Sequence, residues 1–114
     1  MKIRRGHVYV VDFRPRLRTK PGKVRPAIVV QHDVLNDAEY PSTVVVPITS
    51  RLADSAAPLR LRLPSGTAGL ARESDVLVGQ VIAVANESFQ KELGVLPGEL
   101  LAALDEKLRW ILSL

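Results

Sequence analysis

Residues 43–49 read Thr-Val-Val-Val-Pro-Ile-Thr, a run dominated by β-branched side chains. Such side chains fit the pleated surface of a sheet better than they fit a helix, so the run predicts a β-strand. Pro47 has no amide hydrogen to give to a ladder, which indicates a bulge or a sheet edge near the end of this strand. The chain is therefore expected to be built around strands.

Similar apolar runs occur on both sides of this segment. They predict strands at residues 6–13, 25–31, 59–63 and 75–85, with a short final strand at 92–96. Residues 59–63 alternate leucine with arginine, which is the period-two pattern of a half-buried antiparallel strand. Gly79 marks an expected bend in the long run at 75–85, and a short helical turn capped by Asp33 is expected at 33–40.

The C-terminal segment has a different period. Leucine and isoleucine recur at intervals of three and four from Leu100 to Leu112, which predicts an amphipathic helix. Trp110 lies on this helix and is expected to fill the core or an interface. Five or six short strands followed by one helix predict a mainly β fold, a small barrel or curled sheet with the helix packed on it. A length of 114 residues fits one domain, residues 1–114.

Composition excludes several classes of site. The chain has no cysteine, which rules out disulfides, cysteine nucleophiles and zinc–thiolate centres. His7 and His32 lack the spacing of a metal-binding pair, and the glycine-rich loops that hold nucleotides are missing. No apolar run approaches the roughly eighteen residues of a membrane span. We therefore expect a cytoplasmic protein without metal, cofactor or membrane association.

Charge is unevenly distributed along the chain. The net charge is +4, but residues 1–32 carry nine basic side chains and one acid, Asp12. Between Phe13 and His32 there is no acid, and residues 14–22 form an expected long loop with two prolines. Such a segment predicts a surface for a polyanion such as nucleic acid. The alternative is a solvated loop that only keeps the protein soluble.

Two strand ends carry candidate functional residues. Arg25 begins one expected strand, and Thr49, followed by Ser50, ends another. Strand ends of a small barrel converge at a rim, where a guanidinium can fork two hydrogen bonds onto a phosphate and a hydroxyl can add a third. The residues alone leave open that Thr49 caps a turn and that Arg25 is solvated. Glu73 and Asp75, two apart on a strand, are a weaker candidate as a carboxylate pair.

Six short motifs occur in an order and spacing that together are specific. They are residues 5–9 (Arg-Gly-His-Val-Tyr), 13–15 (Phe-Arg-Pro), 25–30 (Arg-Pro-Ala-Ile-Val-Val), 46–50 (Val-Pro-Ile-Thr-Ser), Gly69-Leu70 with Ser74 and Gln80, and 105–108 (Asp-Glu-Lys-Leu). Through them the chain resembles, over nearly its full length, the MazF/PemK family of toxin endoribonucleases.

This resemblance implies an SH3-like barrel that forms a homodimer and cleaves single-stranded RNA at a short sequence without a metal. It implies products with 2′,3′-cyclic phosphate and 5′-OH ends, and neutralisation by a cognate antitoxin protein. By position, Arg25 and Thr49 are the implied catalytic pair, and Thr19 aligns with a substrate-contacting serine. The residues expected to bind RNA are Thr19, Lys20, Lys23, Ser50 and Gln80.

The chain departs from the family pattern at three places. Lys20 stands where many members have an acid, Arg18 where they have glycine, and residues 79–82 read Gly-Gln-Val-Ile in place of Asp-Gln-Ile/Val-Arg. These departures concern RNA sequence preference and antitoxin contacts, and they leave Arg25 and Thr49 unchanged. Two alternatives remain: a gyrase-poison toxin of the same fold resembling CcdB, and an RNA-binding module that does not cleave. The basic segment and the intact pair favour RNA over gyrase as the target, and the departures at Gly79 and Ile82 leave the RNA-binding module open.

Overall fold

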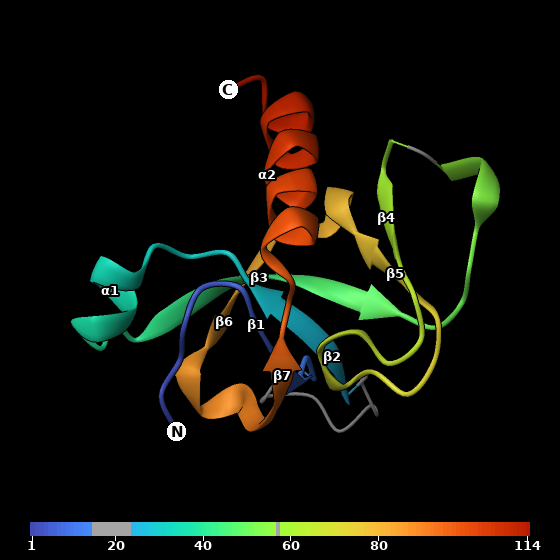
Figure 1. Ribbon diagram of the computed structural model, residues 1–114. Helices are drawn as coiled ribbons and strands as arrows, with labels where there is room; N and C mark the ends of the chain where they lie inside the picture. The colour runs from blue at the N-terminus through green and yellow to red at the C-terminus, as the bar shows by residue number, and fades with distance from the viewer. Residues whose placement is uncertain (15–23, 57) are drawn as a thin grey trace.

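The computed structural model describes residues 1–14, 24–56 and 58–114. Within these residues the chain forms one antiparallel sheet in the order β4-β5-β3-β2-β1-β7, with β6 also paired to β3. The strands are β1 (His7–Asp12), β2 (Val24–Val29), β3 (Ser42–Thr49), β4 (Arg60–Leu63), β5 (Ser74–Leu77), β6 (Ile82–Ala85) and β7 (Phe89–Val95). The sheet curls into a barrel-like shape that is not closed (Figure 1). The prediction of a mainly β fold is confirmed.

The central strand is β3, which contains the valine run. It pairs with β2 and β6 along its first part, and its last two residues, Ile48 and Thr49, pair with β5. Val45, Val46 and Ile48 are buried. The strand therefore joins the two parts of the sheet, and its partner changes near Pro47.

The described part of the chain has seven strands, one more than the expected upper number. The run at 75–85 is divided into β5 and β6 by a 3₁₀ turn at Val78–Gln80 (η3), so the bend expected at Gly79 ends one strand and begins another. The final strand is also longer than predicted. Its central residues, Gln90 to Glu92, are polar and exposed, which hides the strand signal, but they lie along β1 and complete its pairing.

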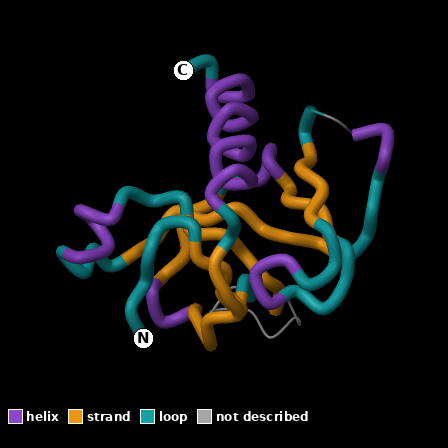
Figure 2. Tube along the Cα trace, in the orientation of Figure 1, coloured by secondary structure: helices purple, strands orange, loops and turns teal. Residues whose placement is uncertain are grey.

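Side chains of β1, β2 and β3 alternate between two buried clusters. Val8, Ile28 and Val46 face one cluster, whereas their neighbours Tyr9, Ala27 and Val45 face the other. The helix α2 (Gly98–Leu112) covers the first cluster and buries Leu104 and Leu108 against it. The helix rises from the sheet with its C-terminal end projecting away (Figures 1 and 2). Its predicted amphipathic character is confirmed.

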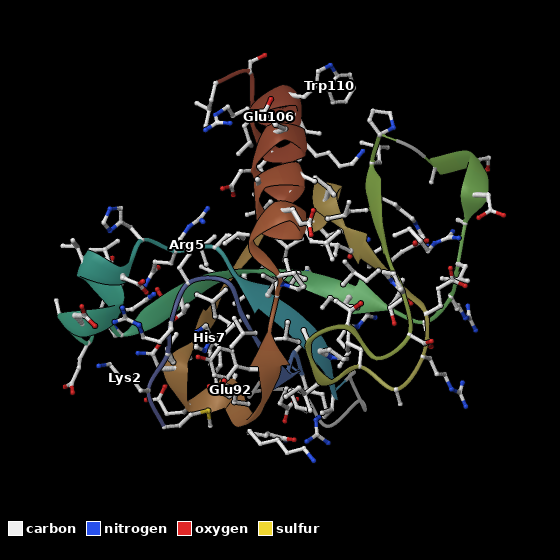
Figure 3. All side chains as sticks on the ribbon, viewed as in Figure 1. Lys2, Arg5, His7, Glu92, Glu106 and Trp110 are labelled. Atoms are coloured by element: carbon white, nitrogen blue, oxygen red, sulfur yellow. The ribbon has the colours of Figure 1, made fainter. Side chains whose placement is uncertain are left out.

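Two side chains differ, wholly or in part, from their predicted roles. Trp110 is 64% exposed near the projecting end of α2 (Figure 3), so it does not fill the core, and its predicted alternative role in an interface stays a prediction. The helix α1 (Asp33–Asp37) is capped by His32, whose Nδ1 accepts a hydrogen bond from the Val34 amide at 3.0 Å. Asp33 was the expected cap, but its carboxylate instead accepts from the Arg5 amide at 2.8 Å and pairs with Arg4.

No helix among the described residues combines the length and the apolar character that a membrane crossing requires.

Candidate active site

The site lies where β3 changes its pairing partner. β2 and β3 are paired as far as Ala27 and Pro47, and beyond this point Pro26 has no amide hydrogen to continue the ladder. β3 then pairs with β5, so β2 separates from β3. A hollow of about 440 Å³ lies at this point, which we call the arginine hollow. It is lined by Val24, Arg25, Pro26, Ile48, Thr49, Ser50, Arg51, Leu70, Ala71, Arg72 and Ser74.

The arginine hollow brings together three of the predicted site residues. Arg25 lines it from β2, and Thr49 and Ser50 line it from the end of β3. The Arg25 side chain is partly exposed and has no ion pair or hydrogen bond to any described residue, so its guanidinium is available to a ligand. Thr49 Oγ1 accepts a hydrogen bond from the Arg51 amide at 3.1 Å. Thr49 thus caps a turn, which was the alternative that the residues alone left open. Its hydroxyl hydrogen remains available for donation to a ligand.

Two further arginines line the same hollow and were not among the predicted site residues. Arg51 follows Ser50 directly, and Arg72 comes from the segment that precedes β5. Neither guanidinium has an ion-pair partner among the described residues. The position of Arg51 next to Thr49 and Ser50 was a usable signal in the sequence. Arg72 had no such signal, because only the tertiary fold brings its segment to β2 and β3.

Among the described residues, no acidic side chain lines the arginine hollow. The nearest acid along β5 is Asp75, which pairs in register with Thr49 but is occupied by arginines of β4. Arg62 Nε donates to one carboxylate oxygen at 2.6 Å and Arg60 Nη1 to the other at 3.1 Å. Burial raises the pKa of Asp75, but the hydrogen bonds from Arg62, the Ala53 amide and Arg60 together hold the pKa below its ordinary value. Asp75 is therefore ionised at neutral pH and its charge is fully engaged.

Glu73 and Asp75 do not form an open carboxylate pair. Asp75 is 1% exposed and accepts hydrogen bonds from three donors, whereas Glu73 is exposed and touches only Arg62, at 3.7 Å. Neither histidine joins the hollow. His7 lies on β1, where it contacts Glu92 of β7 at 3.2 Å (Figure 3), and His32 caps α1.

The basic N-terminal segment is less available to a polyanion than its composition suggests. Arg4 pairs with Asp33 and Asp37, and Arg5 pairs with Asp105 of α2 at 2.7 Å. Arg14 pairs with Asp12, and this contact lowers the pKa of Asp12 to about 2. These three arginines are neutralised by acids from other parts of the chain or from β1. Arg4, Arg5 and Arg14 are therefore not free cations, and the predicted surface for a polyanion depends on the other basic residues of the segment.

Arg25 also lines a second hollow, of about 380 Å³. It is lined by Phe13, Arg25, Pro47, Gln80, Val81 and Ile82. Gln80, a predicted RNA-binding residue, therefore shares a hollow with Arg25 but does not line the arginine hollow. The predicted contacts Thr19, Lys20 and Lys23 lie outside the residues that the structure describes.

A curled antiparallel sheet with a terminal helix and an acid-free hollow lined by arginines defines a small β protein suited to an anionic ligand. The chain belongs to the PemK-like, MazF-like toxin family of type II toxin-antitoxin systems, whose model matches residues 4–112.

Named relatives and solved structures agree with this family. The chain is 32% identical over 114 residues to the endoribonuclease MazF6 of Mycobacterium tuberculosis, with 100% of both chains covered. It is 28% identical to the endoribonuclease EndoA of Bacillus subtilis, covering 100% of this chain and 97% of the relative. The fold matches MazF of Deinococcus radiodurans with a TM-score of 0.80 and 23% identity, over 100% of this chain and 99% of that one. A MazE-MazF structure from the same organism matches with a TM-score of 0.81 and 24% identity, over 100% of this chain and 98% of that one.

Proposed function

We propose that the protein is the toxin endoribonuclease of a type II toxin-antitoxin pair and cleaves single-stranded RNA in the arginine hollow. The observation that carries this proposal is the placement of Arg25 and Thr49 on two diverging strands around a hollow whose described lining also includes Arg51 and Arg72 and contains no acid. An arginine-lined hollow suits a phosphodiester, and the named relatives are endoribonucleases.

The chemistry is an internal transfer within the RNA. The 2′-oxygen attacks the adjacent phosphorus and the bond to the 5′-oxygen breaks, giving a 2′,3′-cyclic phosphate and a 5′-OH. The proton lost by the 2′-OH is balanced by the proton gained by the leaving oxygen. Negative charge grows on the non-bridging oxygens in the transition state, and a fixed guanidinium stabilises that charge. Arg25 takes this role, because a pKa above about 12 makes an arginine a poor proton carrier at neutral pH.

Thr49 positions the phosphate from the opposite side of the hollow. Its oxygen already accepts from the Arg51 amide, so its hydrogen points to another acceptor, a non-bridging phosphate oxygen. Arg51 and Arg72 supply further positive charge for the neighbouring phosphates. Because these guanidinium groups stabilise the transition state directly, the proposed reaction uses no metal and no cofactor.

Substrate contacts extend beyond the catalytic pair. Ser50 binds beside Thr49, and Gln80 presents an amide in the second hollow that Arg25 lines, where it can read a base edge. Thr19 is proposed to contact RNA because it aligns with a substrate-contacting serine of the family, and Lys20 and Lys23 because they belong to the basic segment that contains no acid between Phe13 and His32.

The proposed partners are RNA, a cognate antitoxin and a second copy of the chain. Solved relatives of this fold include complexes of MazE with MazF and an endoribonuclease with its cognate antitoxin. An antitoxin that carries acidic side chains would neutralise the arginine hollow by covering Arg25. We further propose that residues 1–114 act as a single toxin domain in the cytoplasm. The relatives named as endoribonucleases favour RNA cleavage over gyrase poisoning and over binding without cleavage.

Cleavage of a long, varied single-stranded RNA in EDTA tests this proposal, with the new ends mapped by primer extension. We expect discrete cuts with 5′-OH ends. Arg25→Ala is expected to lower the cleavage rate by at least about 10²-fold, the usual effect of removing one transition-state donor. Arg109→Ala is a matched control, because Arg109 is an exposed arginine of α2 that contacts Glu106. Its rate should equal that of the unmodified protein.

Two results would contradict the proposal. Full activity in a folded Arg25→Ala protein would remove Arg25 from the site. A folded, antitoxin-free protein that leaves every RNA intact would shift the function to gyrase poisoning or to RNA binding alone.

A further inference from the structure

Three charged residues behind the arginine hollow form a compact network that the proposed reaction does not use. Asp75 of β5 is 1% exposed, and Arg60 and Arg62 of β4 are partly buried beside it. The network lines a small hollow of about 220 Å³ together with Ala53 and Asp54. Burying a carboxylate is unfavourable unless its oxygens are fully paired, so this arrangement needs a structural or functional reason.

The network holds the segment that follows Thr49 at two points. Asp75 Oδ2 accepts directly from the Ala53 amide at 3.0 Å. Arg60 Nη1 donates to the same oxygen at 3.1 Å and also to the Arg51 carbonyl oxygen at 2.6 Å. Asp75 thus holds Ala53 by a direct hydrogen bond, and it holds Arg51 indirectly, through Arg60.

The same segment controls the direction of the Thr49 hydroxyl. The amide of Arg51 donates to Thr49 Oγ1 at 3.1 Å, so the position of residue 51 decides which side of the oxygen remains free. A continuous set of hydrogen bonds therefore leads from Asp75 through Arg60 and Arg51 to Thr49. Asp75 of β5 is also the register partner of Thr49 of β3, so the two residues lie side by side in the sheet.

We infer that Asp75, acting through Arg60, is a positioning residue that orients the Thr49 hydroxyl and the Arg51 side chain toward the bound phosphate. This inference rests on the proposed endoribonuclease function. Arg62 has a different role. It donates to Asp75 and Asp54 and pairs with Glu73, but it has no hydrogen bond or ion pair with residues 49–53, so it reaches this segment only at Asp54, beyond its end.

The central test compares Asp75→Asn and Arg60→Gln with Glu73→Gln in steady-state RNA cleavage. Misplacement of a catalytic group by about 1 Å costs on the order of 10²-fold in rate, so we expect kcat to fall by about 10- to 100-fold in the first two variants. KM should change by less than about twofold, because Arg25 and Arg72 are untouched. Glu73→Gln removes an exposed acid of the same neighbourhood and should leave both constants unchanged. Because the Arg60 side chain is partly exposed, Arg60→Gln should fold even if Asp75→Asn does not. The test can then be decided from Arg60→Gln alone.

A second readout does not depend on cleavage. Amide hydrogen exchange at Ala53 and Arg51 should accelerate in both Asp75→Asn and Arg60→Gln, while exchange in β1 and β2 stays slow. If the unmodified protein does not cleave RNA, the proposed function fails, and amide exchange still decides whether Asp75 holds this segment.

Arg62→Gln separates positioning from general support. Positioning predicts that Arg60→Gln lowers kcat more than Arg62→Gln, although Arg62 makes the shorter contact with Asp75. The inference would be overturned if Arg60→Gln and Arg62→Gln lose kcat equally and in proportion to their loss of thermal stability. Unchanged amide hydrogen exchange at Ala53 in Asp75→Asn would also overturn it.

Discussion

At the scale of single residues, the hydroxyl of Tyr9 links the N-terminal arm to the core. It donates to the Lys2 carbonyl oxygen at 2.9 Å and accepts from the Arg4 amide at 2.9 Å. The ring packs edge-on against Phe89, with centroids 5.2 Å apart. Burial raises the pKa of Tyr9, so the hydroxyl stays protonated and keeps both hydrogen bonds across the physiological range. Residues 2–4 are thereby held where Arg4 meets Asp33.

Removal of this hydroxyl should destabilise the protein. Tyr9→Phe keeps the buried ring but leaves two backbone groups without a partner, and we expect a loss of about 1–2 kcal/mol in the free energy of unfolding, measured by urea denaturation. Tyr40→Phe removes a hydroxyl from a half-exposed ring with no described partner, and its stability should change by less than about 0.5 kcal/mol. Equal effects in the two variants would show that the Tyr9 hydrogen bonds contribute nothing.

Some residues of the candidate site could be predicted from the sequence, and others could not. Arg25 and Thr49 became candidates because one begins a strand and the other ends one, and the family resemblance then selected them; the register of β2 and β3 explains why they meet. Charge was less informative, because a count along the chain cannot see ion pairs between distant residues. Arg5, for instance, is paired with Asp105, a hundred residues away. Arg72 reaches the hollow only through the tertiary fold.

At the scale of elements, β7 and the 3₁₀ turn Thr67–Gly69 (η2) approach closely through two glycines. A Cβ on Gly69 would lie 2.1 Å from the Leu93 carbonyl oxygen, and one on Gly94 would lie 2.6 Å from the Ala68 carbonyl carbon. Both contacts are with backbone atoms, which cannot move aside as a flexible side chain can. This approach holds the segment that leads into Leu70, Ala71 and Arg72 of the arginine hollow.

A methyl group at Gly69 should therefore separate these elements. Gly69→Ala combines a backbone clash with a φ of +78°, and we expect it to lower the free energy of unfolding by about 3 kcal/mol or more. Gly66→Ala has a similar φ of +84° but open space around the new methyl group, so it should cost only about 1–2 kcal/mol. The difference, measured by urea denaturation, isolates the contact with β7. Similar losses in both variants would assign the whole effect to backbone strain.

The elements themselves could be predicted where the apolar pattern was strong and failed where it was interrupted. The valine run became β3, and the leucine repeat became α2, with only small differences in their ends. The run at 75–85 was divided because η3 turns the chain between two strands, and apolar composition alone does not reveal a turn. The central residues of β7 are polar because they are exposed, although the strand pairs with β1 along its length, with two register shifts.

At the scale of the whole molecule, acids and free arginines occupy different hollows. Arg25, Arg51 and Arg72 line the arginine hollow without an acid, whereas the hollow beside α1 is lined by acids such as Asp37 and Glu39 together with Lys2. A net charge of +4 gives the molecule a modest overall attraction to RNA. The three arginines concentrate positive charge in one hollow, so the RNA is attracted to that place and one orientation of the bound RNA is favoured.

This separation predicts which cations control the salt dependence of RNA binding. Each phosphate contact with a single strand contributes about 0.7 to the slope of log Kd against log salt concentration. Arg51→Ala and Arg72→Ala combined should therefore lower the slope by about 1.4, because both side chains meet phosphates in the proposed complex. Binding is measured by fluorescence anisotropy with labelled single-stranded RNA, on a Thr49→Val background that prevents cleavage during the titration. Lys2→Ala removes a cation that lies beside acids in the other hollow, so it should leave the slope unchanged. If Lys2→Ala lowers the slope as much per charge as the arginine variants do, RNA responds to net charge alone and the arginine hollow does not orient it.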